Sequence, residues 1–169
     1  MPSSLCGEQN IVSLWQYHAL NSKKFVSLCP GGKPTTSPMK DFKKYFIIPA
    51  PPADVYRALT HPATLHLWTG EEAEMSTEPG SEFSLWEGSI VGKNLEFEPD
   101  KKIVQQWYFG EQAEPSIVTL KLHDHKGGTS VELRHTNIPD ADYDDIVEGW
   151  IHTYFASLEE FYHGDSGQQ

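Results

Sequence analysis

Cysteine is scarce in this chain of 169 residues, and its scarcity excludes two kinds of chemistry. Both cysteines, Cys6 and Cys29, lie near the amino terminus, so residues 39–169 contain none. A disulfide framework is therefore excluded for that long part of the chain, and so is catalysis by a thiol within it. The same scarcity fits a reducing compartment, and we expect a cytoplasmic protein.

Long apolar runs and positive charge are also in short supply. No stretch approaches the roughly 20 apolar residues that a membrane-spanning helix needs. The chain has 13 Lys and Arg against 24 Asp and Glu, which gives a formal net charge of -11. Nucleic acids and anionic membrane surfaces both attract basic faces, so we expect neither as a partner. A basic patch on another protein is compatible with this charge.

Motifs that mark catalytic or metal sites are missing as well. The sequence has no glycine-rich phosphate loop, no paired-cysteine motif and no Gly-x-Ser-x-Gly elbow. The best metal-like cluster is His123-Asp124-His125, because on a strand its two imidazoles would share one face. It adjoins the turn Lys126-Gly127-Gly128, where polar residues are expected in any case. We therefore predict a protein that is not an enzyme and holds no metal or cofactor.

The first 38 residues form a segment of different composition. Residues 1–38 carry three lysines and one glutamate, whereas residues 39–169 carry 10 basic and 23 acidic residues. The segment ends in Pro30–Pro38, which is rich in proline, glycine and hydroxyl residues and is typical of a linker. It lacks the basic start and the apolar run of a signal peptide. Two interpretations stay open: a flexible, disordered leader, or an artefact of the gene model with Met39 as the true initiator.

Beyond the linker, the sequence predicts a strand and two short helices. Lys43–Ile48 is rich in β-branched and aromatic residues, and the prolines that follow it end the strand. Pro52 suits the first turn of a helix. Apolar residues then recur at helical spacing at Val55, Ala58 and Leu59. Leu65 and Trp68 indicate a second short helix, which ends at Gly70.

From Glu72 to Thr136 the apolar residues alternate with a period of two, which predicts antiparallel strands. Gly88 and Gly92 bracket a short strand around Ile90. Turn signals separate the strands at several points, among them Glu78–Ser81, Glu98–Lys101 and Lys126–Gly128. We predict a meander of six strands in this region.

The last element is predicted to be one long amphipathic helix. Asp140 or Asp142 can cap it, and it runs to about Tyr162. Six residues at spacings of 4, 3, 4, 4 and 3 fall on one stripe: Tyr143, Val147, Trp150, Tyr154, Leu158 and Phe161. About one face of a sheet is needed to cover that stripe, so the pattern predicts an α+β fold with segregated helices.

Five stretches, taken in order and at their spacing, form a recognisable family pattern. They are Phe83–Gly92, Lys101–Trp107, Pro115–Leu120, Asn137–Pro139 and Glu148–Phe155. Together they resemble the C-terminal domain of the activators of heat-shock protein 90 ATPase. That domain has the helix-grip fold of the START/birch-pollen-allergen (SRPBCC) superfamily. The resemblance implies an antiparallel sheet of about six or seven strands wrapped around the long C-terminal helix, with two short helices after the first strand.

The resemblance covers residues 39–163, which leaves residues 1–38 as a leader and residues 164–169 as a disordered tail. Two-domain members of the family carry a sizeable N-terminal domain that supplies a main part of chaperone stimulation, and residues 1–38 do not match it. Stand-alone domains of this type are common in bacteria. The resemblance implies a non-catalytic binding module with a co-chaperone-like interaction, whose partner is a heat-shock protein 90-type chaperone.

The superfamily also suggests an alternative function, since some relatives bind small apolar molecules in a cavity between the long helix and the sheet. An indole N–H or a phenol can orient such a ligand while its ring covers apolar surface. The candidate lining residues are Trp68, Trp86, Trp107, His135, Trp150 and Tyr154. Ordinary packing between helix and sheet is the other interpretation of the same residues.

Overall fold

A computed structural model describes residues 38–109 and 114–165 of the chain. The predicted leader and tail lie outside this range, apart from Pro38 and the last helical residues. The helices are α2 (Pro52–Thr60), α3 (Pro62–Thr69), α4 (Asp140–Gly149), the π-helical turn η2 (Trp150–Tyr154) and α5 (Phe155–Asp165). The strands are β1 (Met39–Ile48), β2 (Glu82–Leu85), β3 (Ile90–Glu98), β4 (Lys102–Trp107), β5 (Ser116–His125) and β6 (Gly128–Pro139).

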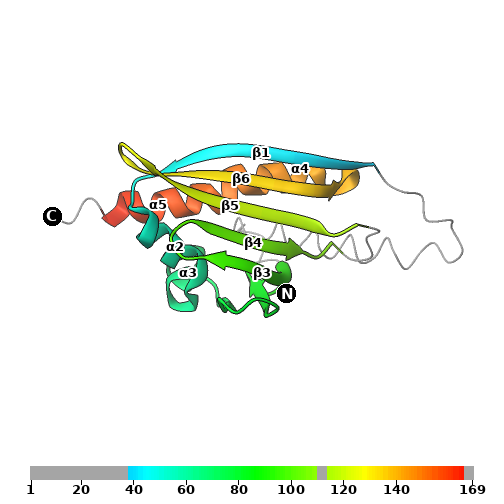
Figure 1. Cartoon of the computed structure of the whole chain (residues 1–169), viewed down its shortest axis with the longest axis horizontal. Coiled ribbons are helices and arrows are strands. Elements are labelled where there is room, and N and C mark those ends of the chain that lie inside the picture. The colour runs from blue at the N-terminus through cyan, green and yellow to red at the C-terminus, as the bar shows by residue number, and fades with distance from the viewer. Residues whose placement is uncertain (1–37, 110–113, 166–169) are drawn as a thin grey trace, which may run out of the picture.

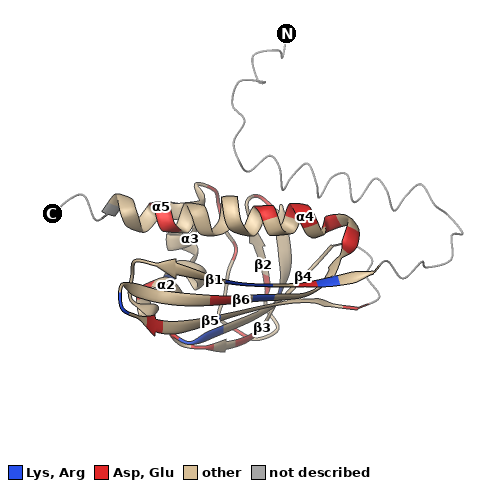
Figure 2. Cartoon of the chain, turned by 90° about the horizontal axis from the view of Figure 1, so that it is seen from above, with Lys and Arg blue, Asp and Glu red and all other residues tan. Residues whose placement is uncertain are grey.

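The strands form one six-stranded antiparallel sheet in the order β1-β6-β5-β4-β3-β2 (Figure 1). The long helix formed by α4, η2 and α5 lies across one face of the sheet (Figure 2). The predicted α+β helix-grip fold is therefore confirmed, with six strands in the sheet. The other face of the sheet is not covered by any described element, and we call it the outer sheet face.

The meander after the short helices has five strands among the described residues, so the predicted six-strand meander is wrong by one. The reason lies at Gly92, which was expected to end a short strand and instead sits inside β3. A Cβ atom at this position would collide with the carbonyl oxygen of Gln106 and lie 2.8 Å from the ring of Phe83. Glycine is therefore present because the strand is crowded there, and it does not mark a break.

The short helices begin and end as the sequence predicts. Pro52 and Pro62 each occupy the first turn, where a missing N–H costs nothing. Gly70 ends α3 in the left-handed conformation with φ 79°, and its N–H donates to the carbonyl of His66. These two helices pack beside one end of the sheet (Figure 1).

The long helix differs from the prediction at its start and at its centre. Pro139 occupies the N-cap position and makes no side-chain cap, so the expected cap by Asp140 or Asp142 is wrong. Both carboxylates instead lie in the first turn, where they complement the helix dipole. At the centre, the N–H of Phe155 donates to the carbonyl of Trp150, five residues earlier, which is the pattern of a π-helical turn.

This π-helical turn determines which side chains reach the core. An extra residue in the turn brings Trp150, Tyr154 and Phe155 onto the buried side together, with exposed fractions of 0%, 3% and 0%. The ring of Phe155 stacks on Phe46 of β1 with centroids 3.8 Å apart. Leu158 continues the buried stripe one turn later. The helix is thus anchored to the sheet at its π-helical turn.

Candidate functional site

The six residues predicted to line a ligand site all lie in one layer between the long helix and the sheet. They come from five places in the chain: α3, the β2–β3 turn, the end of β4, the middle of β6 and the π-helical turn. Their exposed fractions range from 0% to 6%, and they are Trp68, Trp86, Trp107, His135, Trp150 and Tyr154. We call this set the aromatic layer.

The members of the aromatic layer contact one another directly. Trp107 stacks on Trp150 with ring centroids 4.6 Å apart, and Trp150 lies 4.6 Å from Tyr154. Tyr154 in turn meets Trp68 at 5.1 Å and Trp86 at 5.7 Å, both edge to face. Such edge-to-face and offset pairs are favourable arrangements of aromatic quadrupoles. The structure thus brings all six residues together, and their role in lining a ligand cavity stays a prediction.

Trp86 reaches this layer from a strained backbone position. Its φ is 48°, in the left-handed region that a bulky side chain rarely adopts. Glu87 and Gly88 follow with φ of 51° and 85°, and the N–H of Ser89 closes the turn on the carbonyl of Trp86 at 3.0 Å. The β2–β3 turn thereby directs the indole inward, to 2% exposure under Tyr154.

His135 is the polar centre of the layer, and its hydrogen bonds define its tautomer. Trp150 Nε1 donates to His135 Nδ1 at 3.0 Å, so Nδ1 is the acceptor nitrogen. Nε2 then carries the proton and donates to Ser116 Oγ at 2.8 Å. Ser116 Oγ in turn donates a hydrogen bond to the carbonyl of Thr136 at 3.1 Å. These three hydrogen bonds form a continuous series from Trp150 on the helix to the backbone of β6.

Burial keeps the imidazole neutral. Removal from water lowers the pKa of His135 from 6.5 to about 3. Burial likewise raises the pKa of the Tyr154 phenol above its ordinary value. Because Nε2 already carries a proton, His135 cannot accept one from the Ser116 hydroxyl as a general base would. The Ser116–His135 pair therefore holds the layer together and does not have the form of a nucleophile with its base.

A second series of buried hydrogen bonds begins at Trp107 of the aromatic layer. Its Nε1 donates to Gln105 Oε1 at 3.4 Å, and Gln105 Nε2 donates to Asn94 Oδ1 at 2.9 Å. Asn94 Nδ2 then donates to the carbonyl of Ser76 at 3.0 Å and to Ser81 Oγ at 3.1 Å. Gln105 and Asn94 are 4% and 0% exposed. This series fastens the segment between α3 and β2 to the inner face of the sheet.

Sequence reasoning did not single out Ser116, Asn94 or Gln105. The signal for Gln105 and Asn94 was available, since each occupies an inward position of its strand, where an apolar residue is the rule. Ser116 begins β5 and its partner His135 lies 19 residues away on β6. Nothing in the local pattern distinguishes Ser116 from an ordinary turn serine.

An open depression lies on the described surface, away from the aromatic layer. Its volume is about 530 Å³, and it lies between α2, the start of α3, the segment around Ser76 and the β3–β4 turn. Tyr56, Arg57, His61 and Asp100 are among its walls. Burial raises the pKa of the Tyr56 phenol, and the nearby Asp100 carboxylate raises it further. None of the six predicted lining residues borders this depression.

Neither a metal cluster nor a membrane span is found in residues 38–109 and 114–165. No group of three or more His, Cys, Asp and Glu there is arranged to hold a metal ion. The best candidate from the sequence, His123, instead lies 3.4 Å from Glu132 on the outer sheet face. No helix within the same residues has the length and apolar character to cross a bilayer.

A six-stranded antiparallel sheet around one long C-terminal helix, joined by a buried aromatic layer, places this protein in the helix-grip class of α+β folds. Within that class, the chain belongs to the family described as "Activator of Hsp90 ATPase homolog 1-like protein", whose profile matches residues 49–162. The family resemblance expected from the sequence is therefore confirmed.

Similar proteins cover the same part of the chain. The "Activator of 90 kDa heat shock protein ATPase homolog" of Dictyostelium discoideum is 35% identical over 124 residues, which are 72% of this chain and 32% of that protein. The human "homolog 1" is 25% identical over 111 residues, or 64% of this chain and 33% of that protein. This chain thus spans about one third of the length of the curated relatives it matches.

A solved structure matches over nearly its whole length. The crystal structure of an HSP90 activator from Plasmodium falciparum is 28% identical, with a TM-score of 0.66. The match covers 72% of this chain and 94% of that one.

Proposed function

We propose that this protein is a non-catalytic module that binds a heat-shock protein 90-type chaperone in the cytosol and acts as a co-chaperone. The observation that carries the proposal is the match to the Plasmodium falciparum HSP90 activator, of which 94% is covered by this one domain. A chain of this extent is therefore described as an activator in at least one relative. The longer curated relatives support the same partner but contain more chain than is matched here.

The structure is compatible with a binding role that needs no reaction chemistry. The buried histidine His135 is neutral and engaged at both nitrogens, and the buried hydroxyl beside it is engaged as well. Charged side chains lie on the surface, where they can steer an encounter with another protein. A stable contact would use that surface, since the aromatic layer is already filled by its own rings.

The test is a titration of the full chain into a heat-shock protein 90-type chaperone from the same organism, with binding and ATPase rate both recorded. Binding with faster ATP turnover supports a one-domain activator. Binding without acceleration supports a docking domain and overturns the activating role. Absence of binding at every salt concentration overturns the proposal. The chain alone serves as the control for contaminating ATPase activity.

A second candidate function is the binding of a small apolar molecule between helix and sheet. The observation that favours it is that the six predicted residues do meet there, with four indole N–H groups and an imidazole among them. A ligand would have to displace contacts such as the 4.6 Å stack of Trp107 on Trp150. Calorimetric titration with 8-anilinonaphthalene sulfonate tests this function. Saturable binding at one site per chain supports it, and absence of heat up to millimolar dye overturns it.

A further inference from the structure

Charge is segregated between the two layers of the molecule. From Asp140 to Asp165 the long helix contains eight Asp and Glu and neither Lys nor Arg. The outer sheet face instead carries five cations: Lys43, Lys93, Lys102, Lys121 and Arg134. Figure 2 shows acidic positions and no basic ones along the ribbon of α4 and α5, whereas basic and acidic positions both occur on the strands. The outer sheet face also carries the carboxylates Glu82, Glu96, Glu98 and Glu132, so in a protein with a net charge of -11 its cations slightly outnumber its carboxylates.

Two pairs of these cations lie directly opposite one another across neighbouring strands. Lys43 of β1 is paired in register with Arg134 of β6. Lys102 of β4 is paired in register with Lys121 of β5. Like charges in directly opposed positions destabilise a sheet. A sequence that carries two such pairs on one face is not arranged there for the stability of the sheet alone.

The carboxylates on this face compensate four of the five cations. In register, Glu82 lies opposite Lys93, Glu98 opposite Lys102 and Glu132 opposite Lys121. Glu132 lies between the two pairs and contacts Lys43 Nζ at 2.9 Å and His123 Nε2 at 3.4 Å. The hydrogen bond from Lys43 is the main cause that lowers the pKa of Glu132, with smaller effects from His123 and Lys121. One carboxylate is therefore shared by three basic side chains. Lys102 Nζ is paired with Glu96 at 2.6 Å.

Exposed apolar side chains gather on the same face. Five large apolar residues are exposed in the described part of the chain, and four of them lie on the outer sheet face or at its margin. These four are Tyr45 (54% exposed), Ile47 (44%), Val91 (36%) and Tyr108 (39%). Aromatic residues with Arg beside them are the composition typical of protein–protein contact surfaces.

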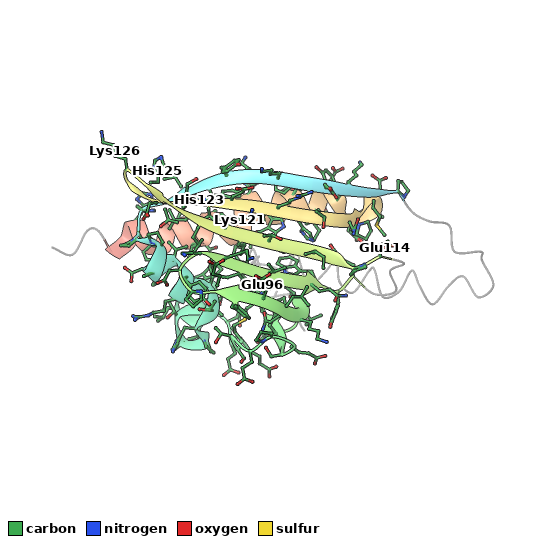
Figure 3. All side chains as sticks on the ribbon, in the orientation of Figure 1. Glu96, Glu114, Lys121, His123, His125 and Lys126 are labelled. Carbon is green, nitrogen blue, oxygen red and sulfur yellow. The ribbon has the colours of Figure 1, made fainter. Side chains whose placement is uncertain are left out.

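We propose that the outer sheet face is a docking surface for an acidic surface of a protein partner. The proposal rests on the proposed function, because the partner is the chaperone, and it adds which face makes the contact and which charge the chaperone presents. An acidic partner surface would supply a carboxylate to Arg134, whose register partners are Lys43 and Thr119, and would offset its repulsion with Lys43. Tyr45 and Ile47 would then be covered at the same time. In Figure 3, Glu96, Lys121 and His123 mark this face.

Arg134 offers the sharpest test. Its register partners are Lys43 on β1 and Thr119 on β5, so the change Arg134→Glu turns a repulsive pair into an attractive one. The fold is therefore expected to gain stability while the docking surface loses charge. If Arg134→Glu is at least as stable as the wild type, misfolding cannot explain a loss of binding. Lys121→Glu is a second variant on the same face.

The experiment measures the dissociation constant of the full chain for the heat-shock protein 90-type chaperone at low and high salt. We expect Arg134→Glu and Lys121→Glu each to weaken binding about tenfold at low salt, and less at high salt. The matched control is Arg57→Glu on α2, which changes the net charge by the same amount and lies outside the outer sheet face. It should bind within about twofold of the wild type.

Each outcome decides between the two proposals. If the wild type binds and Arg134→Glu binds equally well, the docking face is overturned and the proposed function stands. If Arg57→Glu weakens binding as much as Arg134→Glu does, total charge governs the interaction and the docking face is again overturned. If the wild type does not bind at any salt concentration, the proposed function fails and the docking face fails with it.

Discussion

Trp150 on the long helix and His135 on β6 are joined by a hydrogen bond of 3.0 Å from the indole Nε1 to the imidazole Nδ1. Both side chains are 0% exposed. The bond links the π-helical turn to the centre of the sheet, and it leaves Nε2 to donate to Ser116. One contact thus couples the position of the helix to the tautomer of the histidine.

Removal of this hydrogen bond should be costly. Trp150→Phe leaves Nδ1 of His135 without a donor in a site from which water is excluded, and we expect a loss of about 3 kcal/mol in the free energy of unfolding. Urea denaturation measures it. Because His135→Leu removes the orphaned acceptor as well, the double variant should lose less than the sum of the two single variants. Strictly additive losses would contradict the coupling.

The buried neutral histidine should make stability depend on pH. The folded pKa of His135 is about 3, below its ordinary value of 6.5, so in this range the unfolded chain takes up a proton and the folded chain does not. The contribution is complete above pH 6.5 and is lost as pH falls toward about 3, at about 1.4 kcal/mol per pH unit. Between pH 6.5 and 5, His135→Gln should show a flatter dependence than the wild type in urea titrations. Equal slopes would argue against a neutral His135.

Gly92 should tolerate no side chain. Gly92→Ala forces a Cβ atom against the backbone of Gln106 and the ring of Phe83, and we expect a loss of about 3 kcal/mol. Gly127→Ala is the matched control, since the only neighbour of its Cβ would be His125 Nδ1 at 4.0 Å. Thermal unfolding of the two variants should differ by several degrees, with Gly127→Ala close to the wild type. Similar melting temperatures would disprove the crowding at β3.

The like-charge pair on the outer sheet face should be visible in stability alone. Arg134→Glu places opposite charges across β1 and β6, and we expect a gain of about 0.5 kcal/mol at low salt. The gain should shrink in 1 M salt, where exposed charges are screened. A loss of stability at low salt would show that Lys43 and Arg134 do not repel one another in the folded protein.

Much of this fold follows from periodicity in the sequence. The alternation in β4, β5 and β6 identifies their inner faces, and Pro52 and Gly70 mark helix ends for reasons of backbone geometry. Trp107, His135, Trp150 and Tyr154 could be placed in the core because they fall on inward faces of strands or on the apolar stripe of the helix. Trp86 reaches the layer only through the left-handed turn between β2 and β3. Helix periodicity and strand parity are local properties, and a local pattern is sufficient for them.

What the sequence did not reveal depends on contacts between distant segments. The π-helical turn at Trp150–Tyr154 cannot be read from the spacing of the apolar residues, which also fits a regular helix. Gly92 looks like a strand end until Phe83 and Gln106 are seen around it. Ser116 gains its role only from His135, which the β5–β6 hairpin brings opposite.

Trp68, Trp86, Trp107 and Trp150 all lie in the aromatic layer, and they are four of the five tryptophans of the chain. Intrinsic tryptophan fluorescence therefore reports on the contact between the long helix and the sheet. While the helix is packed on the sheet, water is excluded from these indoles and their emission should be shifted to the blue. An event that lifts the helix even slightly would admit water to the rings and shift the spectrum to the red, whereas an event confined to the outer sheet face would leave it unchanged.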